Sequence, residues 1–94
     1  MRLSINEIDF FKKFINNLSN EAKIYLFGSR VDDSKRGGDI DLLVVSKYIT
    51  KQHIRRLKIE FYKLFGEQKL DIILDDGSFK KPFVKYISKD KVAL

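Results

Sequence analysis

The segment DIDLLVV at residues 39–45 constrains the fold of this chain more than any other part of the sequence. Its tail is continuously apolar, which indicates a strand buried on both faces and therefore the centre of a sheet. Because side chains alternate along a strand, Asp39 and Asp41 point to the same face. Two carboxylates at the start of a buried strand repel each other and lose hydration unless a cation lies between them. The segment therefore predicts a central strand that carries a metal site.

The remaining sequence predicts helices and further strands around this one. In chain order we expect a helix over 5–18 begun by a capping box of Ser4 and Glu7, a strand over 23–27, a loop over 29–38, the central strand, a helix between Thr50 and Gly66, a strand over 70–74, a short helix from Pro82 and an edge strand over 92–94. This order indicates a single domain over residues 1–94 of the α/β (α+β) class, in which helices pack on a small mixed sheet of three to four strands.

Apolar residues at helical spacing predict which faces of the helices are buried. The expected inward-facing residues are Ile5, Ile8, Phe11, Phe14, Ile15 and Leu18 in the first helix, Ile54, Leu57, Phe61, Leu64 and Phe65 in the second, and Phe83, Val84 and Ile87 in the last.

Asp71 is the candidate for a third carboxylate at the metal site. It lies between Leu70 and Ile72 in a predicted strand, and if that strand pairs beside the central one, Asp71 converges with Asp39 and Asp41. Three such carboxylates can hold two ions about 4 Å apart, which is the arrangement used for in-line phosphoryl displacement. A site of oxygen ligands without cysteine or histidine suits Mg²⁺ or Mn²⁺ better than Zn²⁺.

Other polar residues receive structural predictions. Asp75 and Asp76 precede Gly77 in a turn, where aspartate commonly accepts backbone hydrogen bonds, so we expect a structural role for both. His53 is the only histidine, has no acidic cluster beside it and is expected at the surface. We also expect Lys35 and Arg36 to be solvated.

The turn after the first strand is a candidate phosphate-binding site. Gly28 allows a close backbone approach, Ser29 adds a hydroxyl donor, and the guanidinium of Arg30 suits a triphosphate. A plain turn at the end of a strand would have the same Gly-Ser pair, so the pattern depends on the carboxylates that follow it.

Composition and charge exclude several classes. Cysteine is absent, so the chain has no disulfides, and a reducing cytoplasmic location is expected. Neither a signal-peptide pattern nor an apolar run of about 18 residues is present, so no membrane span is expected. The net charge of +6 suits a nucleotide, a nucleic acid or an acidic protein as partner.

These motifs resemble a known family. The run Gly28-Ser29-Arg30, separated by the loop from Asp39-Ile40-Asp41-Leu42-Leu43-Val44, resembles the signature of the DNA polymerase β nucleotidyltransferase superfamily. More narrowly, it is similar to the minimal nucleotidyltransferases (MNT) that accompany HEPN-domain toxins in toxin–antitoxin pairs. The resemblance implies a polymerase β-like palm fold, two Mg²⁺ ions held by Asp39, Asp41 and Asp71, and a phosphate-binding turn at Gly28 and Ser29.

The resemblance also implies a reaction. We expect transfer of AMP from ATP to a tyrosine of a HEPN toxin within a hetero-oligomer, with Asp71 placed to accept the proton of the hydroxyl. Two alternatives stay open: a non-catalytic antitoxin that acts by binding alone, and a transferase acting on RNA or a small-molecule hydroxyl. The last two acceptors usually need extra domains, so nucleic acid is not the expected direct substrate.

Overall fold

The computed structural model describes residues 3–28, 39–87 and 91–94. Within these ranges the elements are α1 (Ile5–Leu18), β1 (Lys23–Phe27), β2 (Ile40–Val45), α2 (Lys51–Phe65), β3 (Leu70–Asp75), α3 (Pro82–Ile87) and β4 (Val92–Ala93). The strands form one mixed sheet in the order β3-β2-β1-β4, in which β2 runs parallel to β3 and β1 runs antiparallel to both β2 and β4. The predicted α+β class, the central position of β2 and the edge position of β4 are confirmed. The predicted loop over 29–38 lies outside the described residues.

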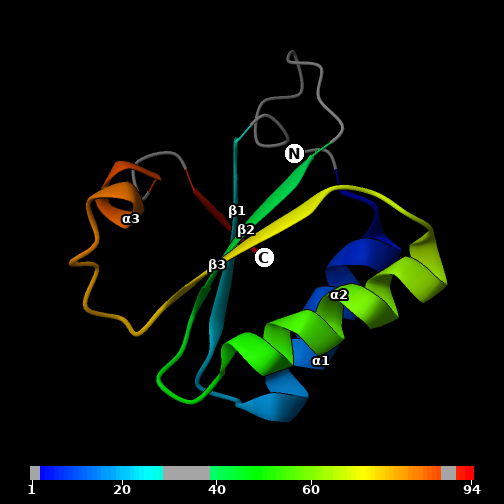
Figure 1. The fold of residues 1–94 in the computed structure, drawn as a ribbon, viewed down its shortest axis with the longest axis horizontal. Coiled ribbons are helices and arrows are strands. Elements are labelled where there is room, and N and C mark those ends of the chain that lie inside the picture. The colour runs from blue at the N-terminus through cyan, green and yellow to red at the C-terminus, as the bar shows by residue number, and fades with distance from the viewer. Residues whose placement is uncertain (1–2, 29–38, 88–90) are drawn as a thin grey trace.

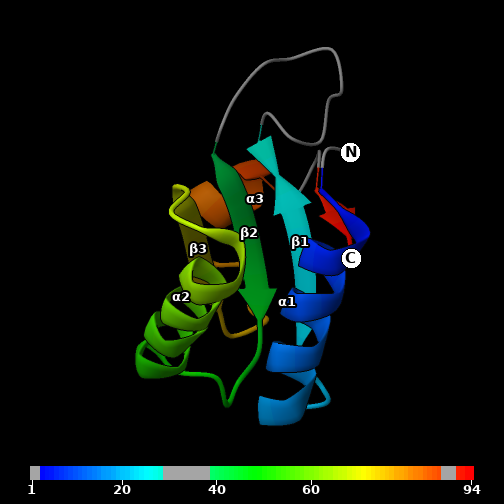
Figure 2. The ribbon, with the colours of Figure 1, turned by 90° about the vertical axis from the view of Figure 1, so that its right-hand side faces the viewer.

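The helices lie on opposite faces of the sheet. Figures 1 and 2 show α1 and α2 side by side on one face, with α3 on the other. Alternation along β2 explains this division: Ile40, Leu42 and Val44 pack in the core under α1 and α2, while Leu43 belongs to a second cluster with Phe27 and Val84 on the α3 side. Both faces of β2 are therefore buried, as its apolar tail predicts.

Aromatic packing joins the two long helices. The rings of Phe11 in α1 and Phe61 in α2 stack with centroids 5.1 Å apart at an interplanar angle of 9°, and both residues are fully buried. Phe10 contacts both Phe61 and Phe65 in edge-on or tilted geometry. Such pairs stabilise a core by about 0.5–1.5 kcal/mol beyond the area they bury, so this cluster fixes α1 against α2.

Both long helices begin with a capping box. In α1 the Glu7 N–H donates to Ser4 Oγ over 3.1 Å, and the Ser4 N–H donates to Glu7 Oε1 over 3.0 Å, as predicted. In α2 the Thr50 hydroxyl accepts from the His53 N–H, and His53 Nδ1 accepts from the Thr50 N–H over 3.0 Å. These capping bonds give His53, which is partly buried, a structural role that was not predicted from the sequence. Gly66 ends α2 with φ of +84°, as its position predicts.

Two residues of the predicted apolar stripes are not buried. Ile5 is 77% exposed and Leu64 is 66% exposed, so the prediction of burial was wrong for both. Ile5 is the first residue of α1 and Leu64 is the last but one of α2. Both residues follow the helical spacing of the apolar stripe, but at these helix ends no described residue covers their side chains. In α3 Val84 is buried as expected, whereas the side chains of Phe83 and Ile87 are not among those described.

A polar clamp connects the turn after α1 to the turn after β2. The Glu21 carboxylate accepts hydrogen bonds from the Ser19 hydroxyl, from the Ser46 hydroxyl over 2.9 Å and from the Lys47 N–H over 3.0 Å. The buried Ser46 hydroxyl in turn accepts from the N–H groups of Tyr48 and Ile49. This network holds the end of the sheet where β1 begins and β2 ends. Asp41 and Asp71 lie at the opposite end.

Candidate active site

Three aspartates come together where β2 and β3 begin. Asp41 in β2 is paired in register with Asp71 in β3, and on its other side it is paired with Phe27 at the end of β1. Asp39 lies just before β2. The Ile40 N–H donates to the carbonyl of Lys69 over 3.0 Å, which holds the starts of the two strands together. The pairing that the convergence of Asp41 and Asp71 requires is present, and it places these two positions side by side.

The carboxylates occupy the less covered face of the sheet. By alternation Asp41 shares its face with Leu43, and Asp71 shares its face with Ile73. Both pairs lie on the face of the sheet that α3 covers. Among the described side chains, the hydrophobic cluster on this face contains only three buried residues, Phe27, Leu43 and Val84. The side chains of Asp39 and Asp71 are accordingly 48% and 51% exposed, so a substrate can reach them from solvent.

Negative charge is concentrated at Asp41. Burial raises the pKa of Asp41 above its ordinary value, and repulsion by the carboxylates of Asp71 and then Asp39 raises it further. The ammonium of Lys69 offsets part of this effect. A carboxyl whose ionised form is disfavoured by neighbouring carboxylates is the group that a bound cation would stabilise most.

Lys69 supplies positive charge to the site. Its Nζ lies 3.6 Å from Asp39 Oδ2 and 3.9 Å from Asp71 Oδ2, so one ammonium bridges two of the three carboxylates. Lys69 was not predicted from the sequence, although a signal was present. Lys69 precedes Asp71 by two positions, and residues so spaced in an extended chain share a face.

Gly28 touches the site directly. Its φ is +78°, and a Cβ at this position would lie 2.5 Å from Asp41 Oδ2 and 3.3 Å from its Cγ. Glycine is therefore favoured for two reasons: the backbone angle disfavours an L side chain, and a Cβ would force the Asp41 carboxylate to shift. The structure places Gly28 beside the carboxylates, whereas Ser29 and Arg30 lie outside the described residues, as do Lys35 and Arg36.

The chemistry of the carboxylate set fits hard divalent cations such as Mg²⁺. Among the described residues, no three acidic or histidine side chains are already arranged so that they could hold a metal ion. Instead, Lys69 contacts two of the carboxylates, and Asp41 carries charge that this ammonium only partly offsets. By their chemistry, Asp39, Asp41 and Asp71 are the residues that could hold such a metal.

The neighbouring aspartates have the structural role that was predicted for them. The buried carboxylate of Asp75 accepts from the N–H groups of Gly77 over 2.8 Å and Phe79 over 3.3 Å. Asp76 accepts from the Ser78 N–H over 2.9 Å. Both therefore stabilise the turn after β3.

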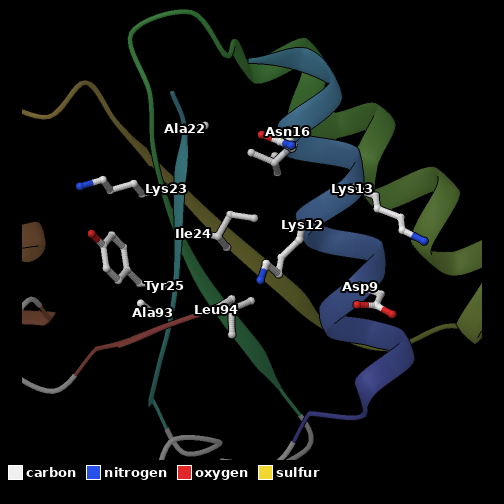
Figure 3. A pocket seen from close by; sticks show the side chains of 11 residues that line it. Asp9, Lys12, Lys13, Asn16, Ala22, Lys23, Ile24, Tyr25, Ala93 and Leu94 are labelled. Carbon is white, nitrogen blue, oxygen red and sulfur yellow. The ribbon is translucent and has the colours of Figure 1, made fainter. Parts of the chain in front are cut away.

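A hollow of about 480 Å³ lies elsewhere, between α1 and the edge of the sheet. It is lined in part by Ile15, Ile24 and Leu94, and Figure 3 shows Lys12 extending over it toward Leu94. Lys13 and Lys23 also line it, but their ammonium groups point in different directions in the same view. The lysines therefore do not converge on a common ligand, and the carboxylates remain the candidate active site.

Carboxylates at the starts of two neighbouring strands are the kind of residues that hold metal ions in phosphoryl-transfer sites. A comparison with protein-family models matches residues 10–94 to the family described as Polymerase beta, Nucleotidyltransferase. The chain belongs to this family, whose members typically use nucleoside triphosphates and divalent metals. A search of curated proteins found no match. Within the described residues, no helix is both long and apolar enough to cross a membrane.

Proposed function

We propose that this chain is a minimal nucleotidyltransferase that moves AMP from ATP to a tyrosine of a partner HEPN toxin, and that it acts as the antitoxin of the pair. The observation that carries the proposal is the register of the two parallel strands. It pairs Asp41 with Asp71 on an accessible face, beside Asp39 and Gly28. The choice of MNT subfamily and of HEPN partner rests on the resemblance of the glycine and aspartate motifs.

The residues of the site have distinct roles in this proposal. Asp39, Asp41 and Asp71 would hold two Mg²⁺ ions, which when bound neutralise the triphosphate and align the acceptor oxygen. The acceptor oxygen forms a bond to the α-phosphorus of ATP, and the bond from that phosphorus to the bridging oxygen of pyrophosphate breaks. Asp71 would accept the tyrosine proton, since its carboxylate is half exposed and open to an acceptor hydroxyl.

Access and charge favour a protein acceptor. Asp39 and Asp71 are about half exposed, so a partner can lay a segment across the α3 face and bring a hydroxyl to the carboxylates. The chain carries a net charge of +6, which attracts an acidic partner surface and speeds association at low salt. Raising the salt concentration should therefore slow formation of the complex.

Mass spectrometry of the co-expressed pair tests the proposal. The chain is co-expressed with a HEPN-domain toxin, and the toxin is examined for an adduct of about 329 Da, the mass of an AMP residue gained with loss of pyrophosphate. The adduct should lie on a tyrosine and should be absent with Asp41→Asn. Asp76→Asn is the matched control, because Asp76 bonds only within its turn among the interactions described, and it should leave the adduct in place.

A different result would select another function. Neutralisation of the toxin with no adduct, from wild type and Asp41→Asn alike, would reject transfer to the partner and support an antitoxin that acts by binding alone.

A further inference from the structure

We propose that Lys69 is a resident counter-ion of the active site, one that competes with divalent metal for Asp39 and Asp71 and so sets the metal affinity of the free protein. This inference rests on the proposed function only through the assignment of these carboxylates as metal ligands. It makes Lys69 a positioning residue that acts through the carboxylates.

The position of Lys69 is fixed by the fold, while its side chain is free to leave. The Lys69 carbonyl accepts from the Ile40 N–H, which anchors the residue at the junction of β2 and β3. From there the ammonium reaches Asp39 at 3.6 Å and Asp71 at 3.9 Å. The side chain is 66% exposed, so release into solvent requires no rearrangement of the core.

The geometry makes the ammonium and a metal ion mutually exclusive at these oxygens. An ammonium that lies 3.6 Å from Asp39 Oδ2 and 3.9 Å from Asp71 Oδ2 already supplies these carboxylates with part of the positive charge that a cation would bring. A divalent ion that binds Asp39 and Asp71 must replace these contacts and also meets the repulsion of a nearby positive charge. Removing the ammonium should therefore tighten metal binding, whereas removing an ordinary surface lysine should not.

The test is a titration of the metal-free full chain with Mn²⁺, followed by the electron paramagnetic resonance signal of free Mn²⁺. Lys69→Met should bind Mn²⁺ about three- to tenfold more tightly than wild type. This is the change expected when the repulsion between an exposed ammonium and a nearby divalent ion is removed. Lys69→Arg retains a cation and should stay close to wild type. Lys63→Met is the matched control, because Lys63 is 67% exposed and pairs with Glu60 at 3.5 Å on α2.

A structural role alone would give a different pattern. If Lys69 only stabilised the fold, Lys69→Met would melt at a lower temperature in EDTA without binding Mn²⁺ more tightly, and this outcome overturns the proposal. Equal Mn²⁺ affinity for wild type and Lys69→Met overturns the role of Lys69 but leaves the proposed function standing. Absence of Mn²⁺ binding in every variant overturns both, since the carboxylates would then not be metal ligands.

Discussion

Asp41→Asn should stabilise the metal-free protein while it abolishes nucleotidyl transfer. The substitution removes one charge and keeps the shape of the side chain. In the folded protein burial raises the pKa of Asp41, and the carboxylates of Asp71 and Asp39 raise it further. Ionised Asp41 therefore opposes folding at neutral pH when no metal is bound, and asparagine removes that opposition.

The magnitude follows from the strand register. Asp41 and Asp71 are paired across parallel strands, and neighbouring strands lie about 4.8 Å apart. Two unit charges at about that distance repel by roughly 0.9 kcal/mol at the dielectric constant of water and by roughly 3.5 kcal/mol at an effective value of about 20. The half-exposed Asp71 and the ammonium of Lys69 favour the lower end, so we expect a gain of about 1 kcal/mol. For a domain of this size the melting temperature should rise by about 4–8 °C.

The pH dependence has a definite sign. Because the pKa of Asp41 is raised in the folded state, its destabilising effect is fully present above that raised value. The effect disappears as pH falls through the raised value toward the ordinary pKa of 3.8. The advantage of Asp41→Asn should therefore be large at pH 7.5 and shrink in acid.

Thermal unfolding followed by circular dichroism in EDTA measures this advantage. Asp76→Asn is the control of opposite sign, because hydrogen bonds from Ser78 lower the pKa of Asp76 and its ionised form favours folding. If Asp41→Asn melts below the wild type at pH 7.5 in EDTA, the account of like-charge repulsion is wrong.

Two further predictions concern the glycine at the site and the polar clamp. Gly28→Ala should lower stability by about 1–2 kcal/mol through its left-handed backbone and should also weaken Mn²⁺ binding and transfer, because its Cβ strikes Asp41 Oδ2. Gly66→Ala shares the positive φ but meets nothing within 4 Å, so an equal loss of Mn²⁺ binding in both variants would contradict the contact argument. The pKa of Glu21 is lowered, chiefly by the hydrogen bond from Ser19, so its stabilising effect is present above the ordinary pKa of 4.5 and lost as pH falls through the folded value. Melting curves should show Glu21→Gln less stable than wild type at pH 7 and equal to it in strong acid, and a pH-independent difference would contradict this reading.

The sheet and the convergence of the carboxylates could be predicted because both depend on local periodicity. Alternation along residues 39–45 places Asp39 and Asp41 on one face, and the same parity argument applied to residues 70–74 gives the face of Asp71. Only the pairing of the two strands had to be assumed. The structure supplies that pairing, parallel and in register at Asp41 and Asp71.

Glu21 and His53 were not predicted from the sequence, for different reasons. Glu21 is an exposed acid in a turn, and its contact with Ser46 depends on how the turns after α1 and β2 meet. His53 replaces the usual glutamate of a capping box, so the ordinary motif does not include it. Burial at helix ends also depends on the tertiary structure, which is why Ile5 and Leu64 follow the helical period yet remain exposed.

The position of the aspartates along the strands reconciles a charged site with a small core. Ile40 and Leu42 are fully buried on one face of β2, and between them Asp41 projects from the other face near the start of the strand. Two positions further on, Leu43 is also fully buried, and an unpaired carboxylate there would lose its hydration at a cost of several kcal/mol. At the strand start, by contrast, Asp41 keeps partial access to solvent and the neighbouring Asp71 remains half exposed. The same register that buries the apolar residues against α1 and α2 therefore places the carboxylates at the start of the strand, where they are open to solvent and their charge costs less than it would in the core.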